Sequence, residues 1–162
     1  MNKISDLAKD SKVWIYQSNR KFTDDEVSTI TTKLEAFTKE WAAHNIALKS
    51  FGKVYYNTFI VLIVDESQTN ASGCSIDTSV HFIQSLEKTY NVNLFDRFCI
   101  AYKQGNNVEI AKKEQFQELI NNGTITSASI VFNNMVQTKE AFEKEWETTI
   151  ENSWHKKVFS IN

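Results

Sequence analysis

The chain has 162 residues, of which 41% are hydrophobic, and its formal net charge is −2. This length and composition exclude a disordered chain and suit one domain with a substantial core, so we expect residues 1–162 to form a single domain. A chain without a basic excess is not expected to bind nucleic acid. Two cysteines are too few for a disulfide framework, which favours a reducing compartment such as the cytoplasm.

The chain also lacks the apolar segments typical of export or membrane insertion. The first ten residues, MNKISDLAKD, contain no apolar stretch of the kind found in signal peptides. The longest apolar run, FIVLIV at 59–64, is far shorter than the roughly 20 residues that a helix needs to span a bilayer. It predicts instead a strand that is buried on both faces.

The first predicted elements are a strand at 13–18 and a long helix. The helix starts at a capping box formed by Thr23 and Glu26, and its apolar residues recur every three or four positions as far as Trp41. Asn45 is a candidate left-handed terminator of this helix. Two strands follow, at 47–57 and 59–67, and Asn57–Thr58 fits the tight turn between them.

The sequence ASGCSID, residues 71–77, leads into a second helix with one apolar side. The segments that follow are predicted from composition, apolar spacing and turn residues. They are a strand at 98–103, its hairpin partner at 108–112, a short helix at 114–123 that ends at Gly123, a strand at 129–137 and a last helix at 138–154.

The first six predicted elements have the order strand, helix, strand, strand, helix, strand. This βαββαβ order is typical of the ferredoxin-like, or split βαβ, arrangement. We therefore expect an α+β fold in which residues 1–104 form an antiparallel sheet with both helices on one face. Residues 105–162 would be a C-terminal β/α extension that adds strands to this sheet or covers its other face.

This topology would gather polar residues at the two ends of the sheet. The set expected at the end where the first helix begins is Asn19, Arg20, Asp24, Asp25, Asn57, Asp96 and Arg97. The set expected at the opposite end is Asp65, Glu66, Cys74, Ser75, Asp77 and Lys103.

Cys74 and Asp77 are the candidate catalytic residues. A thiol at a helix N-terminus can have a lowered pKa and act as a nucleophile. However, His81 lies seven residues further along the same helix, roughly 10 Å away in axial rise, which is too far for direct proton transfer. The structural alternative is that Cys74 packs in the interior as a small apolar group while Ser75 or Asp77 caps the helix.

The other candidate binding residues are acidic, basic or aromatic. Asp65 and Glu66, with Asp77, could supply oxygen ligands to a divalent cation or could be solvated loop carboxylates, and their spacing matches no defined metal loop. Arg97 could bind a carboxylate or phosphate, or could pair with the acidic first turn of the first helix. We predict no metal site and no cofactor.

The motif SWH near the C-terminus supplies two further candidates, Trp154 and His155. Trp154 could stack on a ligand or anchor the tail in the domain. His155 is expected to be exposed, because two lysines follow it. A phosphate-binding loop is not expected, because Ala47 and Val54 replace its first glycine and its hydroxyl residue around Gly52–Lys53.

Several stretches of the chain resemble a small family of uncharacterised bacterial proteins, found mainly in Bacteroidetes. The resembling stretches are SNRKFTDDEV, YNTFIVLIVDES, ASGCSID, LFDRF, IVFNNMV and SWH. Members of this family often carry the label "ABC transporter ATPase". The resemblance implies a stand-alone cytoplasmic protein and transfers no catalytic residue.

We therefore expect a non-catalytic ligand-binding or protein-interaction module in the cytoplasm, with a protein partner or a second copy of the chain as its partner, and without membrane insertion. The first alternative is an enzyme that uses Cys74 or the nearby carboxylates. The second alternative is the ATPase of the family label, which the missing phosphate loop disfavours.

Overall fold

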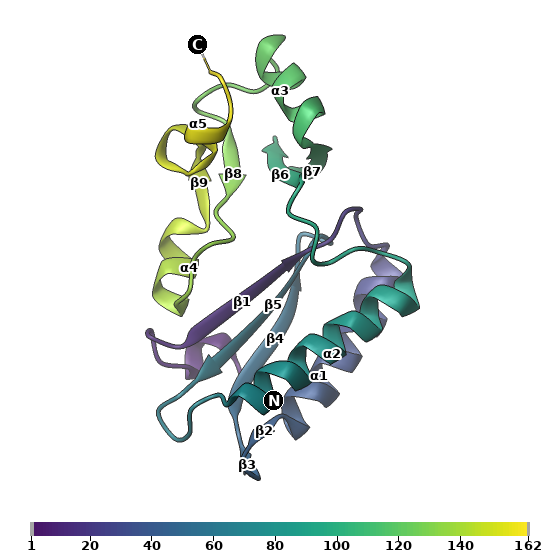
Figure 1. The fold of residues 1–162 in the computed structure, drawn as a ribbon, viewed down its shortest axis with the longest axis vertical. Helices are drawn as coiled ribbons and strands as arrows, with labels where there is room; N and C mark the ends of the chain where they lie inside the picture. Colours follow the sequence, from purple (N-terminus) through teal and green to yellow (C-terminus); the bar gives the residue numbers. More distant parts are fainter. Residues whose placement is uncertain (1, 162) are drawn as a thin grey trace.

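The computed structural model describes residues 2–161 and has an α+β fold (Figure 1). Its first half contains a three-stranded antiparallel sheet in the order β1-β5-β4. The strands of this first sheet are β1 (Lys12–Gln17), β4 (Lys49–Tyr55) and β5 (Phe59–Asp65). The two long helices are α1 (Asp24–Glu40) and α2 (Gly73–Tyr90). The minor elements are η1 (Ile4–Asp6) and the two-stranded ladder of β2 (Ala42–Ala43) and β3 (Ile46–Ala47).

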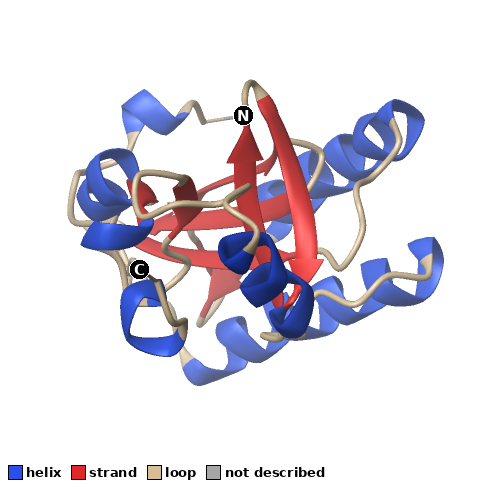
Figure 2. Cartoon of the chain, turned by 90° about the horizontal axis from the view of Figure 1, so that it is seen from above, coloured by secondary structure: helices blue, strands red, loops and turns tan. Residues whose placement is uncertain are grey.

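The second half forms a separate four-stranded antiparallel sheet in the order β7-β6-β8-β9. Its strands are β6 (Cys99–Gln104), β7 (Asn107–Lys112), β8 (Ile130–Phe132) and β9 (Glu147–Thr149). The helices of this half are α3 (Lys113–Asn121), α4 (Lys139–Glu145), η2 (Ile150–Asn152) and α5 (His155–Val158). Seen from above, the strands lie in the middle of the molecule and helices lie around them (Figure 2).

The two sheets are packed against each other between outer helices. Strand β5 is buried along its whole length, as the sequence predicts, and its side chains alternate between two cores. Ile60 and Leu62 face α1 and α2, whereas Phe59 and Val61 pack against residues of the second half such as Trp146. A third core lies between the far face of the second sheet and α3 and α5. The layers are therefore helix, sheet, sheet and helix.

Three strands of the predicted ferredoxin-like sheet have the expected order, but the fourth is in the other sheet. Strand β6 pairs with β7 and β8, so the ferredoxin-like topology is not confirmed. The edge of β1 where a fourth strand would pair is contacted instead by the segment before α4: Lys12 forms a β-bridge with Thr138, and the Val13 N–H donates to the Gln137 carbonyl at 3.0 Å. Helices α1 and α2 cover one face of the sheet, as predicted.

The capping box of α1 is confirmed, since the Thr23 hydroxyl accepts from the Glu26 N–H and the Glu26 carboxylate accepts from the Thr23 N–H. The predicted terminator Asn45 lies instead between β2 and β3, where it has a φ of 65°. The turn between β4 and β5 is centred one residue earlier than predicted, because Tyr56 and Asn57 both have positive φ angles. Gly52 allows α1 to pack closely on β4, since a Cβ there would lie 3.2 Å from Leu34.

The predicted strand at 129–137 and helix at 138–154 are only partly correct. The strand is limited to β8, and the helix ends at Glu145, after which the chain turns into β9. Two successive β-branched residues, Thr148 and Thr149, favour an extended strand that pairs with β8. The apolar stripe of the predicted helix is consequently divided, with Trp146 in the core between the sheets and Ile150 in the core beyond the second sheet.

Candidate functional site

Cys74 lies in the first turn of α2 and is exposed to solvent. The structural alternative, in which Cys74 packs in the interior, is therefore wrong. Helix α2 is capped by Ser72, whose hydroxyl accepts from the Ser75 N–H, so Ser75 belongs to the capping box but is not the cap itself. Within residues 2–161 the Cys74 thiol makes no hydrogen bond, and the Cys74 carbonyl accepts from the Thr78 hydroxyl at 2.9 Å. Both cysteines are free.

The candidate carboxylates Asp65 and Glu66 are occupied by structural contacts. Burial by itself would raise the pKa of Asp65, but hydrogen bonds from the N–H groups of Ala8 and Ser67, together with Lys49, outweigh burial and lower it to about 2. Glu66 accepts from the Ala71 N–H at 2.8 Å and pairs with Lys12 at 3.2 Å.

Asp77, the third candidate carboxylate, is an exposed residue of α2. No group of three or more His, Cys, Asp or Glu side chains in the described part of the chain is arranged to hold a metal ion. The acidic residues near the start of α2 therefore do not form a cation site with the geometry they have here.

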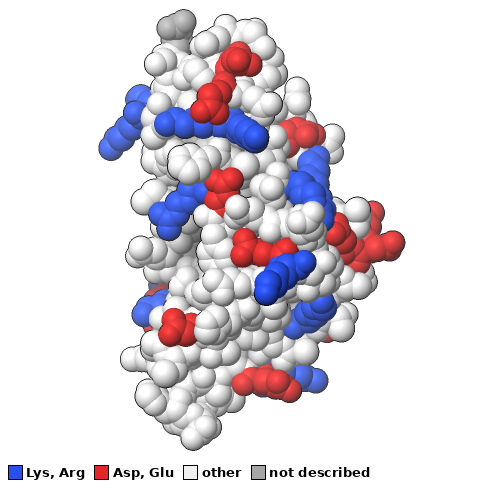
Figure 3. Space-filling view, turned by 45° about the vertical axis from the view of Figure 1, so that its right-hand side comes forward, with Lys and Arg blue, Asp and Glu red and all other residues white. Residues whose placement is uncertain are grey.

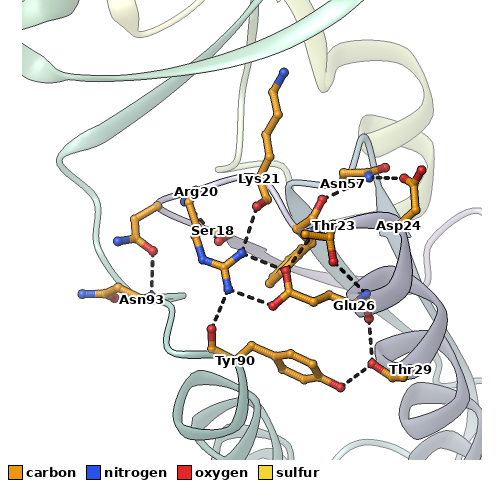
Figure 4. Close-up of polar contacts among 12 residues, drawn as sticks. Ser18, Arg20, Lys21, Thr23, Asp24, Glu26, Thr29, Asn57, Tyr90 and Asn93 are labelled. Carbon is orange, nitrogen blue, oxygen red and sulfur yellow. Dashed lines mark hydrogen bonds and ion pairs between the residues drawn. The ribbon is translucent and has the colours of Figure 1, made fainter.

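An arginine network joins the start of α1 to the end of α2 (Figure 4). Both guanidinium Nη atoms of Arg20 donate to the Glu26 carboxylate at 2.8 Å, and Nη2 also donates to the Tyr90 carbonyl at 2.6 Å. The Arg20 hydrogen bonds, followed by the capping contacts of Thr23, lower the pKa of Glu26 to about 2. Arg20, and not the exposed Arg97, thus pairs with the acidic first turn of α1.

A double-mutant cycle with Arg20→Gln and Glu26→Gln is expected to give a coupling energy of about 1 kcal/mol in urea unfolding at neutral pH. Gln at position 26 keeps the capping box, so the cycle isolates the ion pair. The Glu26 pKa is lowered by folding, so this stabilisation is present above pH 4.5 and is lost as the pH falls towards 2.

The exposed pair of Lys144 and Glu140 on α4 is the control for this cycle and should couple more weakly, because solvent screens an exposed i,i+4 pair. A coupling of the same small size for Arg20 and Glu26 would contradict the role of the bidentate contact.

His155 is buried, with 2% of its surface exposed, so the prediction that it is exposed is wrong. Its Nδ1 lies 2.7 Å from the Ser153 hydroxyl, and its ring stacks on Trp154 with a centroid distance of 3.8 Å. Burial lowers the pKa of His155 to about 4. The Ser153 hydroxyl also accepts from the His155 N–H and donates its proton to the Ile150 carbonyl, which makes it part of a local turn.

Two shallow hollows of about 590 and 570 Å³ lie beside this turn. Trp154 lines the first hollow, Phe159 lines the second, and Glu151 and Lys156 line both. The Trp154 Nε1 is buried without a hydrogen-bond partner within residues 2–161. Trp154 and His155 thus anchor the C-terminal segment to the core formed by α3 and α5.

A different set of side chains meets where β1 ends. The Gln17 amide donates to the Cys99 carbonyl at 2.9 Å and accepts from Asn134 Nδ2 at 3.0 Å, so it joins the start of β6 to the turn after β8. Phe98 and Met135 are the direct neighbours of these two partners in the sequence. They are also the most exposed large hydrophobic residues among the described residues, at 73% and 70%.

Two further residues extend this surface. Phe95 is 43% exposed and contacts the ring of Tyr16 on β1 at a centroid distance of 5.4 Å. Arg97 lies between the two phenylalanines and is exposed. We define the junction surface as the residues that meet around the end of β1: Gln17, Phe95, Arg97, Phe98, Asn134 and Met135.

The junction surface also has internal support. The Asn134 side-chain oxygen accepts from the Trp146 indole Nε1 at 2.9 Å, and Trp146 is buried between the two sheets. The Asp96 carboxylate accepts from the Phe98 N–H at 2.8 Å, which fixes the backbone just before β6. The exposed apolar side chains therefore project from a backbone that hydrogen bonds hold in place.

Of the junction surface, the sequence pointed only to Arg97. The motif LFDRF contains two phenylalanines around a charged pair, which is the signal that could have indicated an exposed aromatic group. Gln17 and Asn134 are 117 residues apart, and their contact has no sequence signal.

No protein-family model, curated protein or solved structure matches this chain. Among the described residues, none of the helices combines the length and apolar character needed to cross a bilayer.

Proposed function

We propose that this protein is a non-catalytic protein-interaction module that binds a partner through the junction surface. The observation that carries the proposal is the exposure of Phe98 and Met135 on either side of the Gln17 bridge. Single exposed apolar residues are normal on protein surfaces, but a cluster held on a fixed backbone is typical of a binding site. Phenylalanine and methionine are also enriched in protein interfaces.

A macromolecular partner fits this surface better than a small ligand. The apolar side chains of the junction surface are exposed to solvent and do not line either of the two hollows described above. Small-molecule sites are usually concave and enclose most of the ligand. The junction surface offers exposed anchors for a pocket or groove on another protein.

The thiols do not favour the enzyme alternative. Burial, followed by the neighbouring Asp96 carboxylate, raises the pKa of the Cys99 thiol, which therefore stays protonated at neutral pH. Cys74 is exposed but has no hydrogen-bonded base in the described structure. We also infer a cytoplasmic location, which is supported by the two unpaired cysteines.

The test is a comparison of the unmodified protein with the double variant Phe98→Ser/Met135→Ser in cross-linking from extracts of the producing cells. We expect a partner recovered with the unmodified protein to be reduced about tenfold or more with the variant, because losing two apolar anchors costs a few kcal/mol of binding. Sedimentation of the purified protein shows whether that partner is a second copy of the chain.

Ile46→Ser is the matched control, since Ile46 is 54% exposed on the β2–β3 hairpin, outside the junction surface. It should recover the partner as well as the unmodified protein does. Equal recovery by the double variant, with its fold intact by circular dichroism, would contradict the proposal.

A further inference from the structure

We propose that the segment bound by the junction surface is acidic and carries an apolar side chain that contacts Phe98. This inference rests on the proposed function and specifies the chemistry of the partner. It follows from three exposed basic residues that are neighbours of Phe98 along the backbone: Arg97, Lys112 and Lys113.

The backbone brings these three cations to one place. Lys112 is the cross-strand partner of Cys99, the residue that follows Phe98. The Lys113 N–H donates to the Phe98 carbonyl at 3.1 Å, and Arg97 directly precedes Phe98. The start of β6 and the end of β7 thus bring three basic residues close to Phe98 along the backbone.

The three cations are available to an external anion. Within residues 2–161, none of them forms an ion pair, although seven ion pairs occur elsewhere. Two carboxylates are adjacent to these cations in the sequence. Asp96 already accepts from the Phe98 N–H and lies 3.8 Å from the Cys99 sulfur, whereas Glu114 is exposed and forms no ion pair in the described structure. Carboxylates of a partner would therefore complement charges that the chain itself leaves unpaired.

An acidic protein segment fits better than nucleic acid. The chain has a net charge of −2, and the face drawn in Figure 3 shows basic and acidic groups interspersed without a continuous basic stripe. Nucleic-acid binding usually requires an extended basic footprint that follows many phosphates. Three cations that neighbour one exposed aromatic residue match a short acidic segment with one apolar anchor.

The test measures binding of three fluorescently labelled probes by anisotropy, at low and high salt. The probes are a short peptide of Asp and Glu with one central Phe, the same peptide with Asn and Gln in place of the acids, and a single-stranded oligonucleotide. We expect the acidic peptide to bind about tenfold more tightly than the neutral one, with the difference shrinking as salt screens the charges.

The triple variant Arg97→Gln/Lys112→Gln/Lys113→Gln should bind the acidic peptide about tenfold more weakly. The small binding free energies of a few exposed ion pairs together give a factor of roughly this size. Its control changes the net charge equally at exposed lysines outside the junction surface: Lys39→Gln/Lys156→Gln/Lys157→Gln. The control should bind like the unmodified protein.

Three results would overturn this inference: no measurable binding of the acidic peptide, equal binding of the neutral peptide, or tighter binding of the oligonucleotide. If the cellular partner is lost with Phe98→Ser/Met135→Ser but retained with the charge variant, the interaction function stands and only the acidic chemistry fails. If the partner is retained with both variants, the proposed function fails as well.

Discussion

Trp146→Ala is expected to lower the free energy of unfolding by about 3–5 kcal/mol, the range found for removing a large buried aromatic side chain. Trp146 is 3% exposed and lies where the two sheets meet. Its ring stacks on Phe142 at a centroid distance of 4.7 Å and contacts Phe59 and Phe132, both at 4.9 Å. The surrounding rings belong to both sheets and to α4. Because these elements are held by their own contacts, the rings cannot all move inwards to fill the cavity left by the indole. Urea unfolding followed by circular dichroism measures the loss.

Trp146→Phe is the matched variant for this experiment. It keeps an aromatic ring in the core but removes the hydrogen bond to Asn134, so we expect a smaller loss of about 1–2 kcal/mol. Because Asn134 also donates to Gln17, both variants should loosen the junction surface as well. A loss below about 1 kcal/mol for Trp146→Ala would show that the sheets do not depend on this contact.

Local sequence signals predict much of the first half of the fold. The capping box of α1 and the apolar run of β5 are each decided within a few residues, and both are confirmed. Sheet membership is decided over longer distances. Nothing within residues 98–103 distinguishes a strand beside β1 from one beside β8, and the chain uses the Thr138 bridge at the edge of β1 instead. The ferredoxin-like prediction fails at this step.

The last predicted helix shows how tertiary pairing outweighs an apolar stripe. Phe142, Trp146 and Ile150 have helical spacing, but the stripe serves two cores on opposite faces of the second sheet. The intervening residues Thr148 and Thr149 pair with β8 to make this possible. Helical periodicity alone cannot show that one stripe is shared by two layers.

The candidate site was predicted less well, because side-chain exposure depends on the whole fold. Cys74 is exposed, which excludes the interior alternative that the sequence left open, and His155 is buried although two lysines follow it. His155 is covered because α5 packs onto the core containing Phe116 and Phe159. Phe98 remains exposed because β6 belongs to the second sheet, a placement that the sequence did not predict.

Burial of His155 predicts that the protein loses stability between pH 6.5 and pH 4. Its pKa is lowered from 6.5 to about 4, because burial in the folded state disfavours the charged imidazolium. In this pH window the unfolded chain binds a proton that the folded chain does not, so the free energy of unfolding decreases as the pH falls. The stabilisation is fully present above pH 6.5, and we expect about 2–3 kcal/mol to be lost by pH 4.

Urea unfolding at several pH values measures this loss as the slope of the free energy of unfolding against pH. His155→Gln should reduce this slope, even though the substitution also lowers the free energy of unfolding at pH 7. The control is His81→Gln, which makes the same substitution at an exposed histidine of α2 and so measures its effect outside the buried site. Asp65 and Glu26, with pKa values of about 2, stay ionised in the folded protein over most of this window and contribute mainly below it. Equal slopes for the unmodified protein and His155→Gln would mean that the imidazole is protonated in the folded state, which is incompatible with its buried stacking on Trp154.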